Sequence, residues 1–234
     1  MTMNNNMYRQ SVESWNPFVG CEHDCVYCES SFKRQMKRRK KHCLDCYNFT
    51  PHFHPERLIR SLPRTNKNDF IFCCDMGDVA FCEPEWMEQI LARIEQLHDR
   101  TFLIQSKNPS VFSDYRFPEN VLLGTTLETN RDDLYSGMSK APLPSQRYKA
   151  MLNLRHPKKI VTMEPVIDFD VETMEKWVRE IGPEVCYVGY DSKKNYLPEP
   201  ELAKVEVLMK KLSKITDLRA KTIRRAWWQG QERI

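Results

Sequence analysis

Short apolar runs alternate with longer helical patterns along the chain. Six such runs, each bounded by Pro, Gly, Asp or Asn, are 16–20 (NPFVG), 69–74 (DFIFCC), 101–106 (TFLIQS), 120–127 (NVLLGTTL), 158–166 (KKIVTMEPV) and 184–190 (EVCYVGY). Several are apolar almost throughout, which is typical of strands buried on both faces of a parallel sheet. We therefore predict a β-strand at each run.

Three segments between or after these strands carry helical patterns. In residues 84–98, Pro84 stands in the first turn and apolar residues recur on one face, and 171–182 and 200–215 are similar. This alternation predicts an α/β fold built as a right-handed βα series, either an open doubly wound sheet or a partial barrel. Both architectures place function at the carboxyl ends of the strands.

The chain of 234 residues, 41% of them hydrophobic, suits a single domain over 1–234 with a sizeable core. The longest interruption, at about 29–68, is predicted to be an insertion between the first two strands. There is no run of about 18 uncharged apolar residues, and residues 1–10 show no signal or transit pattern. We therefore expect a soluble, cytoplasmic protein with no membrane partner.

Nine cysteines are many for a reducing compartment, where they more often serve as metal ligands or catalytic groups than as disulfides. Cys21, Cys25 and Cys28 form C-x3-C-x2-C directly after the first predicted strand. Three thiolates can hold three irons of a [4Fe-4S] cluster and leave the fourth iron open to a ligand. The alternatives are three core thiols, or a zinc site completed by His23 or by the Cys43/Cys46 pair.

The cysteine motif, with the aromatic Tyr27 directly before its last cysteine, resembles the hallmark of the radical S-adenosylmethionine (radical SAM) superfamily. Within that superfamily the chain is most similar to a phage-associated radical SAM-like family. The landmarks that carry this narrower resemblance are WNPFVGCEHDCVYC (15–28), FHPERL (53–58), FCCDMGDVAF (72–81), FLIQSKNP (102–109), LLGTTLET (122–129), VTMEPVID (161–168) and YVGYDS (187–192).

The resemblance implies a partial (β/α)6 TIM-type barrel with the cluster loop after its first strand. It also implies that Cys21, Cys25 and Cys28 hold a [4Fe-4S] cluster whose open iron binds S-adenosylmethionine (SAM). One electron from an external flavodoxin or ferredoxin would cleave SAM to methionine and a 5′-deoxyadenosyl radical, which takes hydrogen from a substrate. Tyr27 would pack near the adenine of SAM.

Further cofactor-binding candidates follow the second strand. Members of the superfamily commonly carry a Gly-Gly-Glu type motif there, contacting the methionine amino group. This chain departs from the motif and has Asp75, Met76, Gly77 and Asp78 instead, so backbone carbonyls and one carboxylate would make the contact. The alternative is an ordinary turn with Asp78 near a helix N-terminus.

Polar residues recur at the ends of the later strands, where ribose oxygens or the methionine carboxylate would lie. Glu164, in an otherwise apolar run, is costly to bury unless it is paired or used. Arg147 is expected to pair with Glu164 or to bind the SAM carboxylate. The full set of these candidates is Ser106, Lys107, Thr125, Thr126, Glu128, Arg147, Glu164 and Tyr190.

The predicted insertion contains a second group of possible metal ligands, Cys43, Cys46, His52 and His54. Their types would suit a Cys2His2 zinc site. An auxiliary cluster, a redox-active cysteine pair or simple packing remain alternatives. The other cysteines, Cys73, Cys74, Cys82 and Cys186, lie in or near apolar strands and are expected in the core.

The net charge of +4 implies no overall attraction to nucleic acid, but seven of the nine residues at 33–41 are Lys or Arg. This run is either a phosphate-binding segment or a solvated helix face. The leading hypothesis is a radical SAM enzyme acting on a nucleotide, nucleic acid or modified base. The alternatives are a non-catalytic, metal-stabilised nucleic-acid-binding protein and an enzyme that uses SAM for group transfer.

Overall fold

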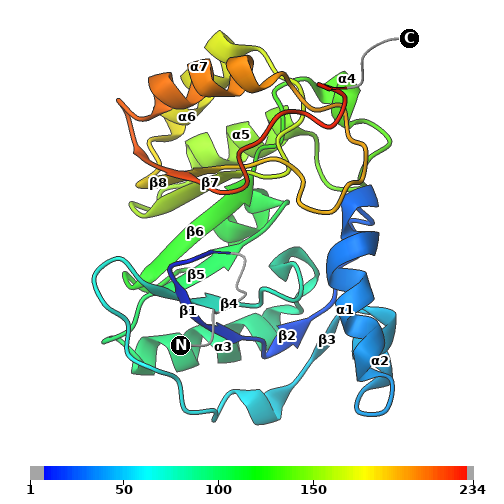
Figure 1. Cartoon of the computed structure of the whole chain (residues 1–234). Helices are drawn as coiled ribbons and strands as arrows, with labels where there is room; N and C mark the ends of the chain where they lie inside the picture. The colour runs from blue at the N-terminus through cyan, green and yellow to red at the C-terminus, as the bar shows by residue number, and fades with distance from the viewer. Residues whose placement is uncertain (1–7, 231–234) are drawn as a thin grey trace.

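A single sheet of seven parallel strands, in the order β1-β4-β5-β6-β7-β8-β9, curves into a half-barrel in the computed structural model, which describes residues 8–230 (Figure 1). Its strands are β1 (Ser11–Trp15), β4 (Phe70–Cys73), β5 (Phe102–Gln105), β6 (Val121–Thr126), β7 (Lys159–Met163), β8 (Val185–Val188) and β9 (Asp217–Ala220). The neighbours along this order are all parallel. The predicted α/β partial barrel is confirmed.

The longer helices lie on the outer face of the sheet (Figure 1). The helices are α1 (Arg34–Met36), α2 (Leu44–Asn48), α3 (Pro84–Gln96), α4 (Asp132–Tyr135), α5 (Pro144–Asn153), α6 (Val171–Ile181) and α7 (Leu202–Leu212), with short turns η1 (Val26–Cys28), η2 (Glu29–Lys33), η3 (Lys37–Arg39), η4 (Pro55–Arg57), η5 (Val79–Phe81) and η6 (Pro109–Asp114). The three predicted helices correspond to α3, α6 and α7. Each turns its apolar face to the sheet, as the burial of Ile90, Val178 and Leu208 shows.

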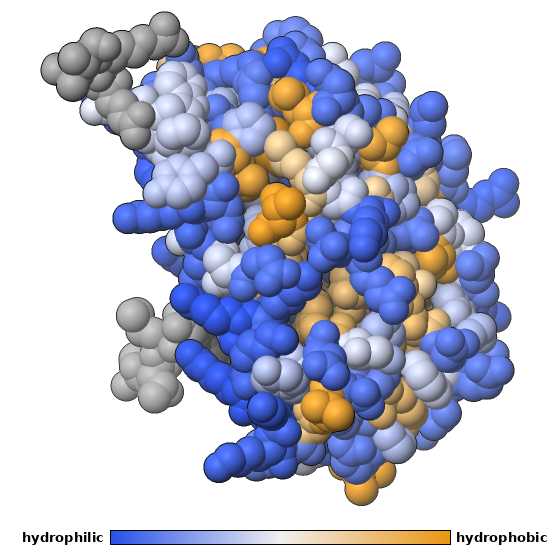
Figure 2. All heavy atoms as spheres, turned by 90° about the vertical axis from the view of Figure 1, so that its right-hand side faces the viewer, coloured by the Kyte–Doolittle hydropathy of each residue, from blue (hydrophilic) through white to orange (hydrophobic). Residues whose placement is uncertain are grey.

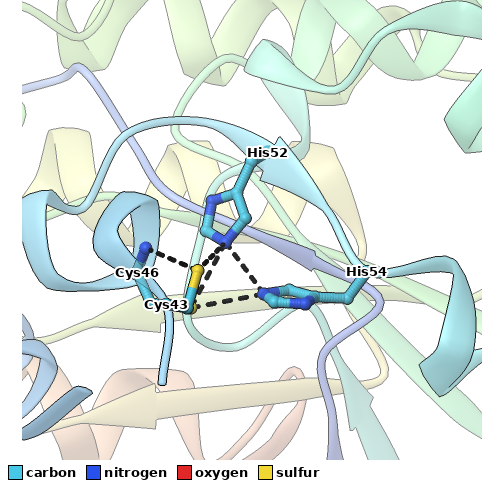
Figure 3. Close-up of side chains that lie close together, drawn as sticks. All are labelled: Cys43, Cys46, His52 and His54. Carbon is cyan, nitrogen blue, oxygen red and sulfur yellow. Dashed lines mark hydrogen bonds between the residues drawn. The ribbon is translucent and has the colours of Figure 1, made fainter. Parts of the chain in front are cut away.

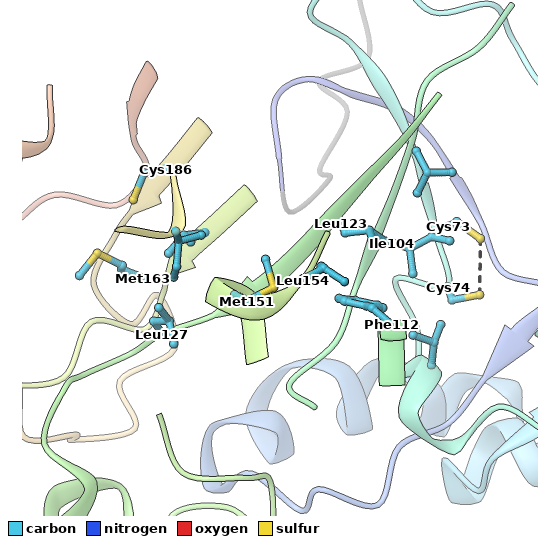
Figure 4. Close-up of a cluster of buried hydrophobic side chains, with 14 of the residues drawn as sticks. Cys73, Cys74, Ile104, Phe112, Leu123, Leu127, Met151, Leu154, Met163 and Cys186 are labelled. Carbon is cyan, nitrogen blue, oxygen red and sulfur yellow. Dashed lines mark hydrogen bonds between the residues drawn. The ribbon is translucent and has the colours of Figure 1, made fainter. Parts of the chain in front are cut away.

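The main core lies between the sheet and these helices (Figure 4). Every residue of β6 and β7 is buried, as expected for strands covered on both faces. Cys73, Cys74, Cys82 and Cys186 belong to this core, so their prediction as core residues is confirmed. A smaller apolar cluster fills the inner, concave face around Tyr8, whose hydroxyl contacts Gln105 and Thr162.

The edges of the sheet differ from the prediction. The run 16–20 does not enter the main sheet; Phe18–Val19 forms β2, which pairs antiparallel with β3 (His52–Phe53) in a separate two-stranded sheet. The first strand of the main sheet is instead β1, and β9 is a seventh strand that the pattern did not reveal. Both are partly exposed edge strands, so neither shows a continuous apolar run.

Residues 29–68 form η2, α1, η3, α2, β3 and η4; α1 and α2 lie on one side of the barrel, and after β3 the chain passes along the bottom of the view to the other side (Figure 1). The β2–β3 pair joins this segment to the chain just before Cys21. Among residues 8–230, no helix is long and apolar enough to cross a membrane.

Candidate metal and cofactor site

Two glycines place the cysteine loop at the carboxyl edge of the sheet. Gly20 forms a bridge with Gly77, which follows β4, and its N–H donates to the carbonyl of Met76 at 3.0 Å. Gly20 has φ +108°, and a Cβ there would lie 2.3 Å from the carbonyl oxygen of Thr50. Because only glycine fits this close approach, the loop that begins at Cys21 starts from a fixed point.

Cys25 and Cys28 lie within one turn of chain, with the Cys28 N–H donating to the Cys25 carbonyl at 2.9 Å. Asp24, with φ +52°, reverses the loop before this turn and is among the residues that tolerate the left-handed region. The Cys25 sulfur is 3.1 Å from the Ser139 hydroxyl oxygen. Cys25 is buried, and Cys21 and Cys28 are half-buried.

The ammonium group of the half-buried Lys107 is one of the contributions that favour the thiolate forms of the three cysteines. A hydrogen bond from Cys28 is the main cause that lowers the pKa of Cys25, and Lys107 adds to it. The same hydrogen bond raises the pKa of Cys28, and burial raises that of Cys21. Cys25 and Cys28 pack in one apolar cluster with Tyr27, and Cys21 packs in another with Val19 and Met76.

Glu128 is the centre of a buried charge network beside these thiols. Its carboxylate pairs with Lys107 and with Arg147, 2.8 Å away, and accepts a hydrogen bond from the Tyr27 hydroxyl at 2.6 Å. Burial opposes the ionisation of Glu128, but the charges of Arg147 and Lys107 outweigh it and lower its pKa to about 2. Tyr27, Lys107, Glu128 and Arg147, all predicted site residues, are thus brought together.

One donor of this network has no partner. Arg147 is completely buried, and its Nε and Nη1 donate to the carbonyls of Pro142 and Thr126 and to Glu128. Its Nη2 makes no hydrogen bond to the part of the chain described, residues 8–230. A buried guanidinium donor left unpaired is unfavourable, so this atom fits an external acceptor such as a carboxylate.

The Asp78 carboxylate connects the ends of β4 and β5 to the cysteine loop. Its two oxygens accept hydrogen bonds from Ala80 N, Lys107 N and the Ser106 hydroxyl, at 3.0, 2.8 and 2.5 Å. The His23 Nε2 lies 3.1 Å from the same carboxylate. Cys21, His23 and Asp78 thus have donor atoms close enough to hold a metal, but the oxygens of Asp78 already accept several hydrogen bonds.

The remaining candidates after β4 and β6 are mostly used inside the fold. Asp75 accepts hydrogen bonds from Ser14 and Asn16, which follow or end β1, and Met76 lies beside Cys21 in a small apolar cluster. The Thr125 hydroxyl donates to the Ser106 carbonyl, and Thr126 accepts from Gln105. These contacts join the ends of β1 and β4, and of β5 and β6.

The structure differs from the prediction for one ion pair and for the position of one candidate residue. Arg147 does not pair with Glu164, because Glu128 takes that place; Glu164 pairs instead with Lys221, which follows β9. Since β9 was not predicted, this partner was not either. Tyr190 is completely buried in the main core, and its hydroxyl donates to the Pro200 carbonyl at 3.0 Å, so it is not brought to the thiols.

The segment around α4 supplies site residues that sequence reasoning missed. The Met138 carbonyl accepts from Val26 N at 2.9 Å, and Ser139 contacts both the Cys25 sulfur and the His23 carbonyl. The ring of Tyr135 lies 4.4 Å from the Arg147 guanidinium carbon. Nothing in the local pattern of 135–139 marks it as part of a site, because these residues reach the cysteines only through folding.

The second group of ligands converges in space (Figure 3). The Nε2 atom of His52 is 3.4 Å from the Cys43 sulfur, 3.2 Å from the Cys46 sulfur and 2.8 Å from the Nε2 of His54. All four donor atoms lie within 4.8 Å of one another. These four side chains could therefore bind one metal ion.

The donor types also fit the groups that the resemblance implies. Cys21, Cys25 and Cys28 offer three soft thiolates, the ligand type that selects iron–sulfur clusters. The Lys107 ammonium group, which pairs with Glu128, lies over the ring of Tyr27, and Tyr27 packs with Cys25 and Cys28.

Fold and site together define an α/β half-barrel protein with a cysteine loop at the carboxyl edge of its sheet. Residues 8–180 match the model of the family described as "Protein of unknown function (DUF5131)", and the chain belongs to this family. No curated protein matches the chain.

Among solved structures, the chain is similar to SuiB of Streptococcus suis, in the crystal structure of SuiB bound to the precursor peptide SuiA. The TM-score is 0.54 at 10% sequence identity, and the match covers 89% of this chain and 48% of that chain. The chain therefore spans about half the length of SuiB, and the likeness concerns the fold.

Proposed function

We propose that this protein is a radical SAM enzyme. The observation that carries the proposal is the C-x3-C-x2-C loop, which starts from Gly20 beside the residues that follow β4, at the carboxyl edge of a half-barrel. SuiB, whose fold is similar over 89% of this chain, supports the half-barrel architecture that the proposal requires. The narrower resemblance to phage-associated relatives stays a prediction.

In this proposal Cys21, Cys25 and Cys28 hold the [4Fe-4S] cluster. The bound cluster and SAM, supplied with one electron from a flavodoxin or ferredoxin, provide methionine and a 5′-deoxyadenosyl radical that takes hydrogen from the substrate. The chain contributes positioning and exclusion of water. The positive charge of Lys107 favours the thiolate form of Cys25, whereas burial opposes it while keeping water away from the sulfur.

The Glu128 network orients the groups that would hold SAM. Arg147 keeps its Nη1 on Glu128 and its guanidinium over Tyr135, which leaves the free Nη2 to donate to the SAM carboxylate. Tyr27 donates to Glu128, so its ring is held in one orientation beside Cys28. Asp78 anchors the backbone of Lys107 and thereby the position of its ammonium group.

Cofactor chemistry tests the proposal directly. After anaerobic reconstitution, the protein is expected to bind about four irons at this loop and, once reduced, to convert SAM to 5′-deoxyadenosine. The measurements are iron and sulfide analysis, electron paramagnetic resonance before and after SAM addition, and chromatography of the nucleoside products. Methylthioadenosine or a methylated product would indicate group transfer, and absence of iron uptake would contradict the proposal.

We assign the substrate to nucleic acids or their nucleotides, on the basis of the charged segment 33–41. Met36 is buried in the cluster with Val19. Because Met36 faces inward, the neighbouring basic side chains are exposed. Within residues 8–230, no ion pair neutralises Arg34 or the five exposed cations of 37–41. The side of the molecule where α1 and α2 lie is largely hydrophilic (Figure 2), as a surface for phosphates requires.

Replacement of Lys37, Arg38 and Lys40 together by glutamine is expected to weaken binding to DNA or RNA. Each lost phosphate contact lowers the slope of log affinity against log salt by about 1. The measurement is a fluorescence-anisotropy titration at several salt concentrations. The matched control replaces three exposed lysines elsewhere, Lys149, Lys210 and Lys214, by glutamine. Equal losses in both variants would mean that the segment 33–41 has no special role.

A metal-stabilised nucleic-acid-binding protein without catalysis is the second candidate. It is favoured by the converging Cys43, Cys46, His52 and His54 side chains next to the basic segment. This candidate predicts salt-sensitive nucleic-acid binding and metal at that site, but no SAM cleavage under reducing conditions. The reconstitution experiment therefore separates the two candidates.

A further inference from the structure

We propose that Cys43, Cys46, His52 and His54 form a closed structural zinc site that fastens residues 29–58 to the start of the cysteine loop. This inference is independent of the radical SAM proposal. It concerns a second group of side chains, which comes from the start of α2, from β3 and from the residue before η4 (Figure 3).

The tautomers of the two histidines are set by their outer nitrogen atoms. The Nδ1 of His52 lies 2.7 Å from the Thr50 carbonyl oxygen, and the Nδ1 of His54 lies 2.9 Å from a Glu56 carboxylate oxygen. Both partners only accept hydrogen bonds, so each Nδ1 carries the proton. The Nε2 of each ring then faces the cysteine sulfurs. Such outer partners are typical of histidines that bind metal.

A metal cation at the centre of the group would remove the repulsion that these tautomers create between the two Nε2 atoms. The two Nε2 atoms lie 2.8 Å apart, and without a proton between them their lone pairs repel. Two cysteine sulfurs lie 3.2 to 3.4 Å from the same nitrogen atoms. A divalent metal at the centre would bind all four atoms, and the two thiols would release their protons on binding. Two thiolates balance its charge, so the site is neutral.

The separations between the donor atoms favour a single metal ion over a metal cluster. Zinc bonds of about 2.0–2.1 Å to nitrogen and 2.3 Å to sulfur give tetrahedral donor separations of about 3.3–3.8 Å. The 2.8 Å between the two histidine nitrogens and the 3.2 to 3.4 Å from His52 to the two sulfurs would each widen by about half an ångström or less. A [2Fe–2S] cluster would place the histidine pair and the cysteine pair on opposite irons, which donors within 4.8 Å of one another do not allow.

The backbone around Cys43 and Cys46 also fits zinc. The Cys46 N–H donates to the Cys43 sulfur at 3.3 Å, a contact that favours the thiolate. Among the four, Cys46 is buried and the others are half-buried. Because four protein atoms complete a tetrahedral shell, no position is left for substrate, and the site is structural.

The site would support the cysteine loop through direct contacts. His52 is paired with Val19 across the β2–β3 ladder, and Cys21 N donates to the Phe49 carbonyl at 3.3 Å. Cys43 and Cys46 pack in one apolar cluster with Val19 and Cys21. Binding of zinc would therefore fix both the inserted segment and the backbone from which the loop starts.

The test uses the full chain in which Cys21, Cys25 and Cys28 are replaced by alanine, so that loss of the proposed cluster does not affect the readout. This protein is expected to bind one zinc per chain, measured by mass spectrometry of bound metals. Added Co²⁺ is expected to give the visible spectrum of a tetrahedral site with two thiolates. Hydrogen exchange over residues 43–58 is expected to slow when zinc is added.

Further replacement of Cys43 and Cys46 by serine is expected to abolish the bound zinc. His42→Ala, a change of an exposed histidine beside the group, is the matched control and is expected to retain one zinc per chain. His54→Cys keeps a four-donor set, and is expected to retain the metal with a stronger thiolate-to-cobalt band. Absence of zinc from the triple-alanine protein, zinc that survives the serine substitutions, or iron in its place would overturn the assignment.

Discussion

Replacement of Cys25 by alanine is expected to lower 5′-deoxyadenosine formation by more than about 100-fold and to prevent assembly of a complete cluster. Loss of an outer partner of a metal ligand already costs 10- to 100-fold, and Cys25 is proposed as a ligand itself. Cys25 is buried beside Ser139 and Cys28, and Cys28 is itself a proposed ligand of the cluster. The measurements are iron content after anaerobic reconstitution and nucleoside analysis after reduction with SAM present.

Cys186→Ala is the matched control for this prediction. Cys186 is buried in β8 within the main core, and its replacement removes one thiol without touching the cysteine loop. The control is expected to keep its iron and its activity. If the Cys25 variant instead retains full iron content and SAM cleavage, the cluster does not use this loop and the proposed function fails.

Glu128→Gln is expected to destabilise the folded protein by about 3–5 kcal/mol. The substitution keeps the size of the side chain but removes the negative charge between Lys107 and Arg147, which leaves the fully buried Arg147 and the half-buried Lys107 without a counter-charge. Urea unfolding of the metal-free protein, followed by fluorescence or circular dichroism, measures the change in the free energy of unfolding. Glu172→Gln, which breaks an exposed pair with Lys211, is expected to leave that free energy nearly unchanged.

The difference in stability between wild type and the Glu128→Gln variant is expected to depend on pH. The pKa of Glu128 is lowered to about 2 in the fold, and an unfolded glutamate has a pKa of about 4.3. A group whose pKa is lower in the folded state stabilises the fold above its unfolded pKa. The difference in stability between wild type and Glu128→Gln should therefore be constant above about pH 5 and shrink as the pH falls toward 2. A difference that does not change with pH would show that Glu128 is not ionised in the fold.

The central strands and the long helices could be predicted because burial on both faces leaves a continuous apolar signature. β6 and β7 are buried along their whole length, and α3 and α6 present regular apolar faces. The edge strands β1 and β9 contain exposed and half-buried positions, so their patterns do not differ from those of loops. The strand predicted at 16–20 was misplaced because the short β2–β3 pair uses its apolar residues instead.

The candidate sites were predictable where their ligands are close in sequence. Cys21, Cys25 and Cys28 lie within eight residues, and Cys43 to His54 within twelve, so spacing alone marks both groups. Long-range partners were not predictable. Glu164 pairs with Lys221 rather than with Arg147, and Ser139 meets Cys25 across 114 positions of sequence. Such pairs depend on which strand ends adjoin and on which loops fold over them.

The amino-acid sequence by itself determined the class of fold and the chemical type of both ligand groups, since periodic burial and short-range spacing are local properties of the chain. Tertiary structure alone decided how charges are paired. A buried ion such as Glu128 is stable only with a counter-charge within a few ångströms, and the fold determines which residues lie that close. It also decided that four donors in the inserted segment converge on one point, which depends on the side-chain orientations set by the β2–β3 pair and the turn after α2.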